Sequence, residues 1–279
     1  MEQGLPSRTA LGAAMHRAAH QMLEGGNIFA DPFALPVIGP EAKARLVEWA
    51  QPAHRGGMRL FIAARHRVAD DRLAAALAAN VGQVVIVGAG LDTTALRLAG
   101  RVAPVRLFEV DHPATQAWKC ERLAAAGLAL PGFVTLAPVD FERQTLAEGL
   151  LAAGFDAGAP AFFIWLGVVP YLTEAAILST LRCIAAVPGG QVVFDYANPP
   201  EQLDDRLRAA HQRRAEHVAA IGEPWISYFD SGALGARVRD LGAVEIDDLG
   251  PGDIRKRVFG VAEPPLRGNG GHIVWARWP

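Results

Sequence analysis

A glycine-rich turn after an apolar run is the part of this sequence best suited to chemistry. Residues 84–87 are all valine or isoleucine, and Gly88-Ala-Gly90 follows at once. A Gly-x-Gly turn at the end of a buried strand lets the backbone pass close to a nucleotide-like ligand. A second apolar run ends at Asp111, about 20 residues after the turn, where such folds place a carboxylate on a ribose diol. These residues predict an adenosine-containing cofactor.

The residues just after the turn discriminate between cofactors. A dinucleotide site needs a third glycine where this chain has Thr93, and the carboxylate of Asp92 would repel a pyrophosphate. S-adenosylmethionine carries a sulfonium, an ammonium and only one carboxylate, so it suits this turn better. Asp92 can bind that ammonium or cap the following helix. A methyltransferase is therefore favoured, and an NAD(P)-dependent oxidoreductase and a non-catalytic cofactor-binding module remain as alternatives.

Composition limits the partners of the chain. It has 279 residues, of which 51% are hydrophobic and 20% charged, and its net charge is −2. Such a balance supplies a large buried core and no global field that recruits nucleic acid or anionic lipid. No apolar run reaches the roughly 18 residues of a membrane span, and no signal-peptide pattern opens the sequence. We expect a soluble, cytoplasmic protein with a small-molecule substrate, no nucleic-acid or membrane partner and an undetermined oligomeric state.

The elements that position these residues alternate between strand and helix from residue 83 onward. This alternation predicts an α/β protein with a doubly wound, mostly parallel seven-stranded Rossmann-like sheet. The last two strands are expected to form an antiparallel pair. The predicted strands are 84–87, 105–110, 133–138, 161–166, 191–196, 244–249 and 272–278.

The first 82 residues contain no convincing strand and predict an N-terminal helical cap. Ser7 is placed to cap a helix that runs to about Glu24, and Asp31-Pro32 is a typical helix start. A later helix is expected from about Met58. Residues 83–279 then form the methyltransferase domain, with a charged helical lid inserted at about 198–230.

Several segments together resemble the leucine carboxyl methyltransferase family. The matching residues are Ser7-Arg-Thr-Ala10, Phe29-Ala-Asp-Pro-Phe33, Ala64-Arg65 with Asp70-Asp71, Gly88–Leu98, Phe108–Pro113 and Phe162–Thr173. The likeness extends from about Ser7 to Trp278. It implies a class I methyltransferase fold that uses S-adenosyl-L-methionine, with bacterial relatives that include polyketide-type O-methyltransferases.

The resemblance also assigns site residues beyond the turn. Arg65 matches the arginine that holds the cofactor's carboxylate in relatives, as a guanidinium fork can do. Asp140 corresponds to the carboxylate that binds the adenine amino group, and Phe141 packs near the ring. Leu166 stands where many relatives carry a glutamate, so any polar contact of that glutamate is absent here.

The acceptor group is inferred from what the motifs lack. Relatives methylate carboxylates, and no motif supplies an obvious general base. A carboxylic acid is already ionised at neutral pH, whereas a phenol needs a base. His16 and Tyr196 are the base candidates, and neither lies in a motif. No metal site is expected. We therefore favour O-methylation of a small-molecule carboxylate, with a phenolic or other hydroxyl of a polyketide-like molecule as the alternative.

Overall fold

The computed structural model describes residues 7–50, 53–100, 105–141, 143–261 and 270–279. The chain divides into two compact units, one of Met1–Arg67 with Gly88–Phe155 and one of Val68–Val87 with Asp156–Pro279. Helix α3 (Ala53–Ala78) contributes residues to both units. Each unit therefore combines a piece of the N-terminal third with a later part of the chain.

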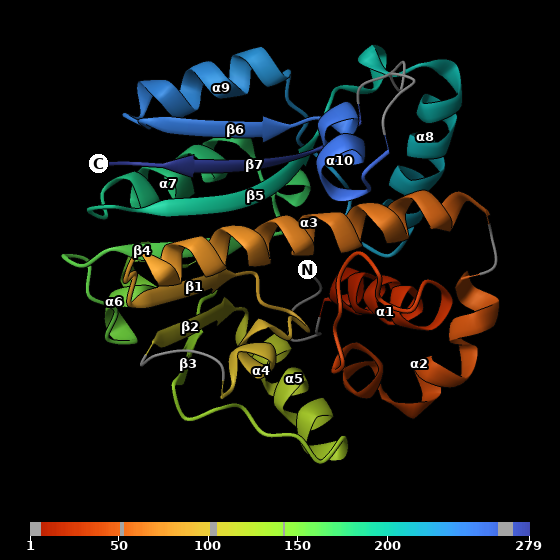
Figure 1. The fold of residues 1–279 in the computed structure, drawn as a ribbon, viewed down its shortest axis with the longest axis horizontal. Coiled ribbons are helices and arrows are strands. Elements are labelled where there is room, and N and C mark those ends of the chain that lie inside the picture. Colours follow the sequence, from red (N-terminus) through yellow and green to blue (C-terminus); the bar gives the residue numbers. More distant parts are fainter. Residues whose placement is uncertain (1–6, 51–52, 101–104, 142, 262–269) are drawn as a thin grey trace. The chain divides into compact units, whose positions relative to one another are not determined.

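The strands of the described residues form a seven-stranded sheet in the order β3-β2-β1-β4-β5-β7-β6 (Figure 1). The β2–β3, β1–β4 and β4–β5 pairs are parallel, whereas β7 runs antiparallel to both β5 and β6. This arrangement confirms the predicted mostly parallel α/β sheet and its antiparallel closing pair. The strands are β1 (Gln83–Val87), β2 (Arg106–Asp111), β3 (Val134–Pro138), β4 (Ala161–Trp165), β5 (Gln191–Ala197), β6 (Glu245–Leu249) and β7 (Gly271–Arg277).

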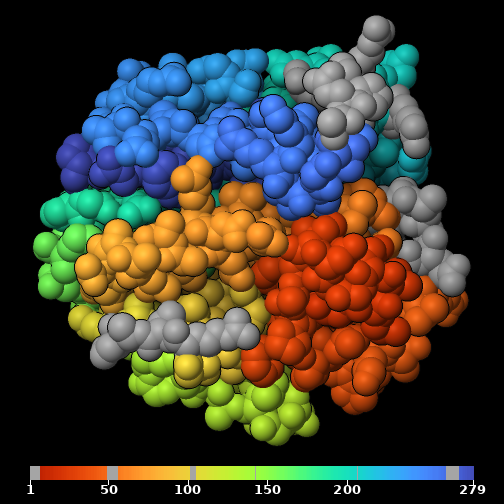
Figure 2. Space-filling model, in the orientation of Figure 1, coloured from red at the N-terminus to blue at the C-terminus, as the bar shows by residue number. Residues whose placement is uncertain are grey.

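The first unit begins with two packed helices, α1 (Arg8–Leu23) and α2 (Ala34–Ala50). Ser7 caps α1 by accepting a hydrogen bond from the Ala10 amide, as the sequence predicts. Small and aliphatic side chains of both helices share one apolar core. Figure 2 shows the outer atoms of this part of the chain in red to orange. The other helices of this unit are α4 (Thr94–Leu98), α5 (Pro113–Ala125) and α6 (Leu146–Ala152).

The second unit holds β1, β4, β5, β7 and β6, the end of α3 and the helices that follow β4. Strands β1 and β4 are buried along their whole length, as expected of strands covered on both faces. Within the described residues, no helix is both long and apolar enough to cross a membrane. The helices after β4 are α7 (Glu174–Ala185), α8 (Asp205–Ala220), α9 (Ser231–Asp240) and α10 (Pro251–Val258), with short 3-10 turns η1 (Val169–Tyr171) and η2 (Pro200–Gln202).

Two helix boundaries differ from the predictions, and one helix was not predicted. Helix α3 begins at Ala53, before the expected Met58, and continues through Gly56 and Gly57, two residues with weak helix propensity. Helix α2 begins at Ala34, because the buried Asp31 carboxylate accepts the Phe33 amide ahead of the first helical turn. Helix α10 is not predicted at all. Ile254 is its only buried residue, so the sequence lacks an apolar stripe there.

Candidate cofactor site

The glycine turn of the first unit has the backbone geometry that its residues predict. Gly88 and Gly90 have φ angles of 70° and 45°, in the region that favours glycine. The amides of Gly88 and Ala89 both donate to the Val110 carbonyl, at 2.8 and 3.0 Å. A Cβ at Gly90 would lie 3.0 Å from the Cβ of Ala10. The turn is thus fixed against the end of β2, with no room to spare beside Gly90.

Asp111 lies beside this turn, as its spacing predicts. Its Oδ2 accepts the Gly90 amide at 2.6 Å, and its Oδ1 accepts the His112 amide at 2.7 Å. Burial raises the pKa of Asp111, and these two amides work against that rise. Each carboxylate oxygen has more than one acceptor site, so the group is oriented by the backbone and can still accept from a ligand.

Asp92 contacts the start of α4 and a histidine of α3. Its Oδ1 accepts the amide of Thr94, the first residue of α4, at 2.7 Å. Its Oδ2 lies 3.9 Å from Nδ1 of His66. Burial alone would raise the pKa of Asp92, but the neighbouring His66 ring and the cations Arg17, Arg97 and Lys119 hold it well below its usual range. The turn therefore contains a buried, ionised carboxylate.

Arg65 and His66 come from α3 in the same unit, and both are buried. The His66 ring stacks on Phe29 with centroids 5.2 Å apart. Burial and the cations Arg17, Arg65 and Arg97 lower the pKa of His66 well below its usual value, although Asp92 opposes them. Sequence reasoning missed His66, and only its place next to Arg65 could have pointed to it.

Asp140 and Phe141 follow β3, close to the end of β2. The Val139 amide donates to the backbone carbonyl of Asp111 at 2.9 Å, which brings the two strand ends together. Asp140 pairs with the exposed Arg143 at 3.5 Å. The Phe141 side chain is 48% exposed, so its ring has surface available for an aromatic ligand.

Glu109, which lies on the same strand as Asp111, forms a buried ion pair with Lys119 of α5. Nζ of Lys119 is 2.6 Å from Oε2 of Glu109, and both residues are almost completely buried. Burial raises the pKa of Glu109 even though Lys119 opposes the shift. Glu109 thus pairs with a cation of helix α5.

The second unit contains Leu166 and Tyr196. Leu166 follows β4, and the next amide, that of Gly167, donates to Asp195 at 2.6 Å. The buried Tyr196 hydroxyl donates to Oδ2 of Asp248 at 2.7 Å, while Oδ1 of Asp248 lies 2.8 Å from Nδ1 of His272. Burial and the Asp248 contact raise the pKa of Tyr196 far above its usual value, which opposes a role as general base.

The other base candidate, His16, is partly buried on α1 in the first unit. Four residues later, His20 is committed to structural contacts. Its Nδ1 lies 3.1 Å from Glu24, and its Nε2 accepts the amides of Ile28 and Phe29. The structure thus separates the expected residues by unit. All the candidate cofactor residues except Leu166 lie in the first unit, as does His16, and Leu166 and Tyr196 lie in the second.

Comparison with known proteins decides the family. The profile of the leucine carboxyl methyltransferase family matches residues 10–185, and this range includes both glycines and all the candidate cofactor residues. The chain belongs to the leucine carboxyl methyltransferase family. A Mycobacterium avium protein, named as an S-adenosyl-L-methionine-dependent methyltransferase, is 33% identical over 224 residues, or 75% of this chain and 74% of its own length. A Bacillus subtilis protein with the same designation is 37% identical over 186 residues, or 63% of this chain.

The match covers 59% of the length of the Bacillus subtilis protein. Solved structures agree with the family's fold. A Thermobifida fusca protein assigned as a methyltransferase has a TM-score of 0.61 at 18% identity, covering 99% of this chain and 96% of its own. A Synechocystis magnesium protoporphyrin IX methyltransferase, solved with bound S-adenosylhomocysteine, has a TM-score of 0.50 at 12% identity, with 96% and 99% covered. These similarities confirm the class I methyltransferase fold.

Proposed function

We propose that this family member transfers a methyl group from S-adenosylmethionine to an oxygen of a small-molecule carboxylate. The observation that carries the proposal is the contact between Asp111 and the Gly90 amide. It places a carboxylate suited to bind ribose hydroxyls beside a glycine turn. The cofactor is S-adenosylmethionine. Both the family of this chain and the negative charge of Asp92 in the glycine turn indicate S-adenosylmethionine.

Different residues of the first unit are suited to bind different parts of the cofactor. Asp111 is suited to the ribose hydroxyls and Asp140 to the adenine amino group, with Phe141 against the ring. Arg65 is suited to the carboxylate at the other end, since a guanidinium pairs with a carboxylate in two parallel bonds. The ionised Asp92 attracts an ammonium and repels a pyrophosphate, which disfavours a nicotinamide dinucleotide.

A carboxylate acceptor needs no general base, and this agrees with the raised pKa of the base candidate Tyr196. In the transfer, a lone pair of the acceptor oxygen forms the new O–CH3 bond as the S–CH3 bond breaks. The sulfonium becomes a neutral thioether, and no proton has to move when the acceptor is already ionised. Catalysis can then rest on alignment, which supplies up to about 7–11 kcal/mol in favourable reactions. A phenol would have to lose a proton, and Tyr196 is held in its neutral form.

The domain boundaries and the position of the lid are part of the same proposal. We assign the helical cap to residues 1–82 and the methyltransferase domain to residues 83–279. The lid, at about 198–230, includes η2 and α8. Asp204 caps α8 by accepting the Leu207 amide, so this charged helix has a defined start. We propose that the lid shapes the acceptor space in a cytoplasmic enzyme.

The test uses S-adenosylmethionine labelled in its methyl group and panels of small carboxylic acids and phenols. A methyl ester releases labelled methanol in mild alkali, whereas an aryl methyl ether survives. We expect label in the carboxylic acid products and its loss in alkali. Alkali-stable label on the phenols alone would overturn the carboxylate assignment in favour of hydroxyl methylation. Transfer to neither panel would contradict the small-molecule acceptor.

A further inference from the structure

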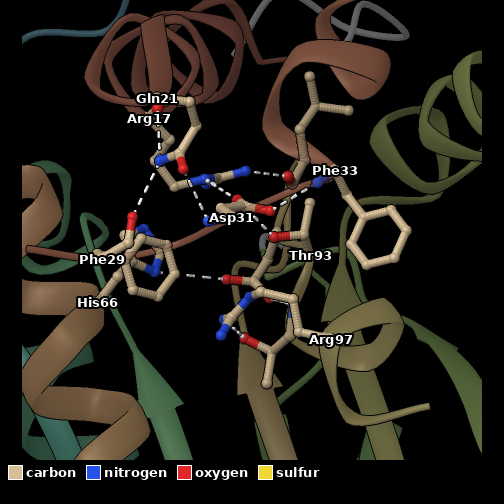
Figure 3. A network of polar contacts seen from close by, with 11 residues as sticks. Arg17, Gln21, Phe29, Asp31, Phe33, His66, Thr93 and Arg97 are labelled. Carbon is tan, nitrogen blue, oxygen red and sulfur yellow. Dashed lines mark hydrogen bonds and ion pairs between the residues drawn. The ribbon is translucent and has the colours of Figure 1, made fainter. Parts of the chain in front are cut away.

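A buried polar network surrounds the segment Phe29–Phe33 and reaches the turn after β1. Figure 3 shows side chains of α1, of this segment and of the turn after β1 pointing toward one another. At its centre lie Arg17 of α1 and Asp31, with exposed fractions of only 4% and 1%. All these residues belong to the first unit.

The Arg17–Asp31 pair contacts the residues on both sides of Asp92. Nε of Arg17 donates to Oδ2 of Asp31 at 3.2 Å, and its Nη2 donates to the backbone carbonyl of Leu91 at 2.5 Å. The hydroxyl of Thr93 donates to the same Oδ2 of Asp31 at 2.8 Å. One ion pair therefore holds Leu91 through its backbone and Thr93 through its side chain. Figure 3 shows Arg17, Asp31 and Thr93 lying together.

Asp31 is itself fixed by its own segment and by α1. Its Oδ1 accepts the Phe33 amide at 3.1 Å, and its amide donates to Oε1 of Gln21 at 2.9 Å. Nε2 of Gln21 donates to the Phe29 carbonyl at 2.9 Å. The position of the turn is thus coupled to the N-terminal helix by consecutive hydrogen bonds.

Stability alone is a weak reason for such a pair. Removing two charges from water is expensive, and well-packed apolar residues often replace a buried ion pair without loss of stability. Arginine has a feature that they lack, since its planar fork reaches two acceptors in fixed directions. Here the two acceptors are the Asp31 carboxylate and the Leu91 carbonyl, so the fork sets the distance between the segment and the turn.

We propose that Arg17 and Asp31 are positioning residues for the cofactor, holding Leu91 and Thr93 so that the Asp92 carboxylate faces the ammonium of S-adenosylmethionine. This inference rests on the proposed function, which places the cofactor at the turn. Neither residue touches the cofactor in this arrangement. Both act through Asp92, so losing their contacts is expected to weaken the attraction between that carboxylate and the ammonium.

The test compares Arg17→Lys with Arg59→Lys. Lysine keeps the charge at position 17 but cannot reach both acceptors. Arg59 is a matched control, because it makes a comparable two-point contact with Glu24 in the same unit, away from the turn. By titration calorimetry with S-adenosylhomocysteine, we expect the Kd to rise roughly tenfold in Arg17→Lys. In Arg59→Lys it should stay within about twofold of the parent, even if thermal unfolding shifts equally.

A double-mutant cycle with Asp92→Asn distinguishes positioning from general stability. If Arg17 acts through Asp92, Arg17→Lys should weaken binding about threefold or less once Asp92 is changed. Independent, multiplicative losses would overturn the inference, and so would a lowered Tm with an unchanged Kd. If Arg17→Lys does not fold, Thr93→Val removes only the hydroxyl contact to Asp31 and is expected to weaken binding in the same direction.

The same titrations separate the two proposals. If Asp92→Asn and Asp111→Ala both bind like the parent, the cofactor site itself is misplaced. If they weaken binding while Arg17→Lys and Thr93→Val do not, the site is correct and the positioning role is wrong.

Discussion

Each unit contains a buried polar cluster, and the two clusters are built differently. In the first unit, Arg17 and Asp111 bond to backbone groups of the turn, namely the Leu91 carbonyl and the Gly90 amide. In the second unit, Asp248 joins Tyr196 to His272, so side chains bond to one another. The first cluster fixes the backbone of the glycine turn, whereas the second joins side chains of β5, β6 and β7 to one another. This difference predicts separate consequences for binding and stability.

The largest expected effect is on binding, from Asp111→Ala. Losing a hydrogen-bonded carboxylate contact costs about 1.5–3 kcal/mol, so the Kd for S-adenosylhomocysteine should rise roughly 10- to 150-fold. Asp248→Asn provides the matched control in the other cluster and should leave this Kd unchanged. A titration in which Asp248→Asn weakens binding as much as Asp111→Ala would abolish the distinction between the clusters.

Tyr196→Phe should give the reverse pattern. It removes a buried hydroxyl that donates to Asp248, and we expect a loss of about 1.5 kcal/mol in the free energy of unfolding. Cofactor affinity should not change. Urea unfolding and calorimetry on the same preparation measure both quantities. A Tyr196→Phe protein of parental stability would show that the hydrogen bond contributes nothing.

His66 should give the first unit a dependence on pH. The pKa of His66 is lowered in the fold, so below about pH 6.5 the unfolded chain binds a proton that the folded chain does not. Stability attributable to His66 therefore falls as the pH falls, by up to about 1.4 kcal/mol per pH unit, until the lowered pKa is reached. Arg17, Arg65, Arg97 and Asp92 are the charges that act on it.

His66→Phe removes this titration and can keep the ring contact with Phe29. Relative to the parent protein, the variant should gain stability in urea unfolding as the pH is lowered from 7 to 5. Comparing the two proteins cancels the opposite trend from Glu109 and Asp111, whose pKa values are raised. A difference that does not vary with pH would show that His66 titrates normally.

The smallest effect is expected at an exposed cap in the first unit. Thr145 and Glu148 form a reciprocal capping box at the start of α6. Thr145→Ala should cost about 1 kcal/mol of stability, as loss of such a cap usually does. The cofactor Kd should stay at the parental value, because α6 does not contact the turn network through these residues. Reduced affinity in this variant would mean that any loss of stability in the unit weakens binding.

The sequence predicted the parts of the site that depend on local backbone chemistry. Gly88 and Gly90 were identifiable because a tight turn after an apolar strand needs positive φ angles, which the structure has. Asp111 was identifiable from its spacing along two strands of one sheet. The predicted strands also agree with the observed ones to within about two residues, since buried parallel strands are continuous apolar runs.

The contacts that the sequence did not reveal join distant segments. Arg17 reaches Asp31 across 14 residues and Leu91 across 74, and Tyr196 reaches Asp248 across 52. No local pattern encodes these distances. The role of Tyr196 in particular depends on Asp248, a partner that only the pairing of β5, β7 and β6 brings near.

The most direct test of the central claim is a crystal structure of the protein with S-adenosylhomocysteine. We expect both ribose hydroxyls within hydrogen-bonding distance of the Asp111 carboxylate. The amino-acid end should have its ammonium facing Asp92 and its carboxylate on the Arg65 guanidinium. A cofactor bound away from Asp111, or bound in the reverse direction along the turn, would contradict the account.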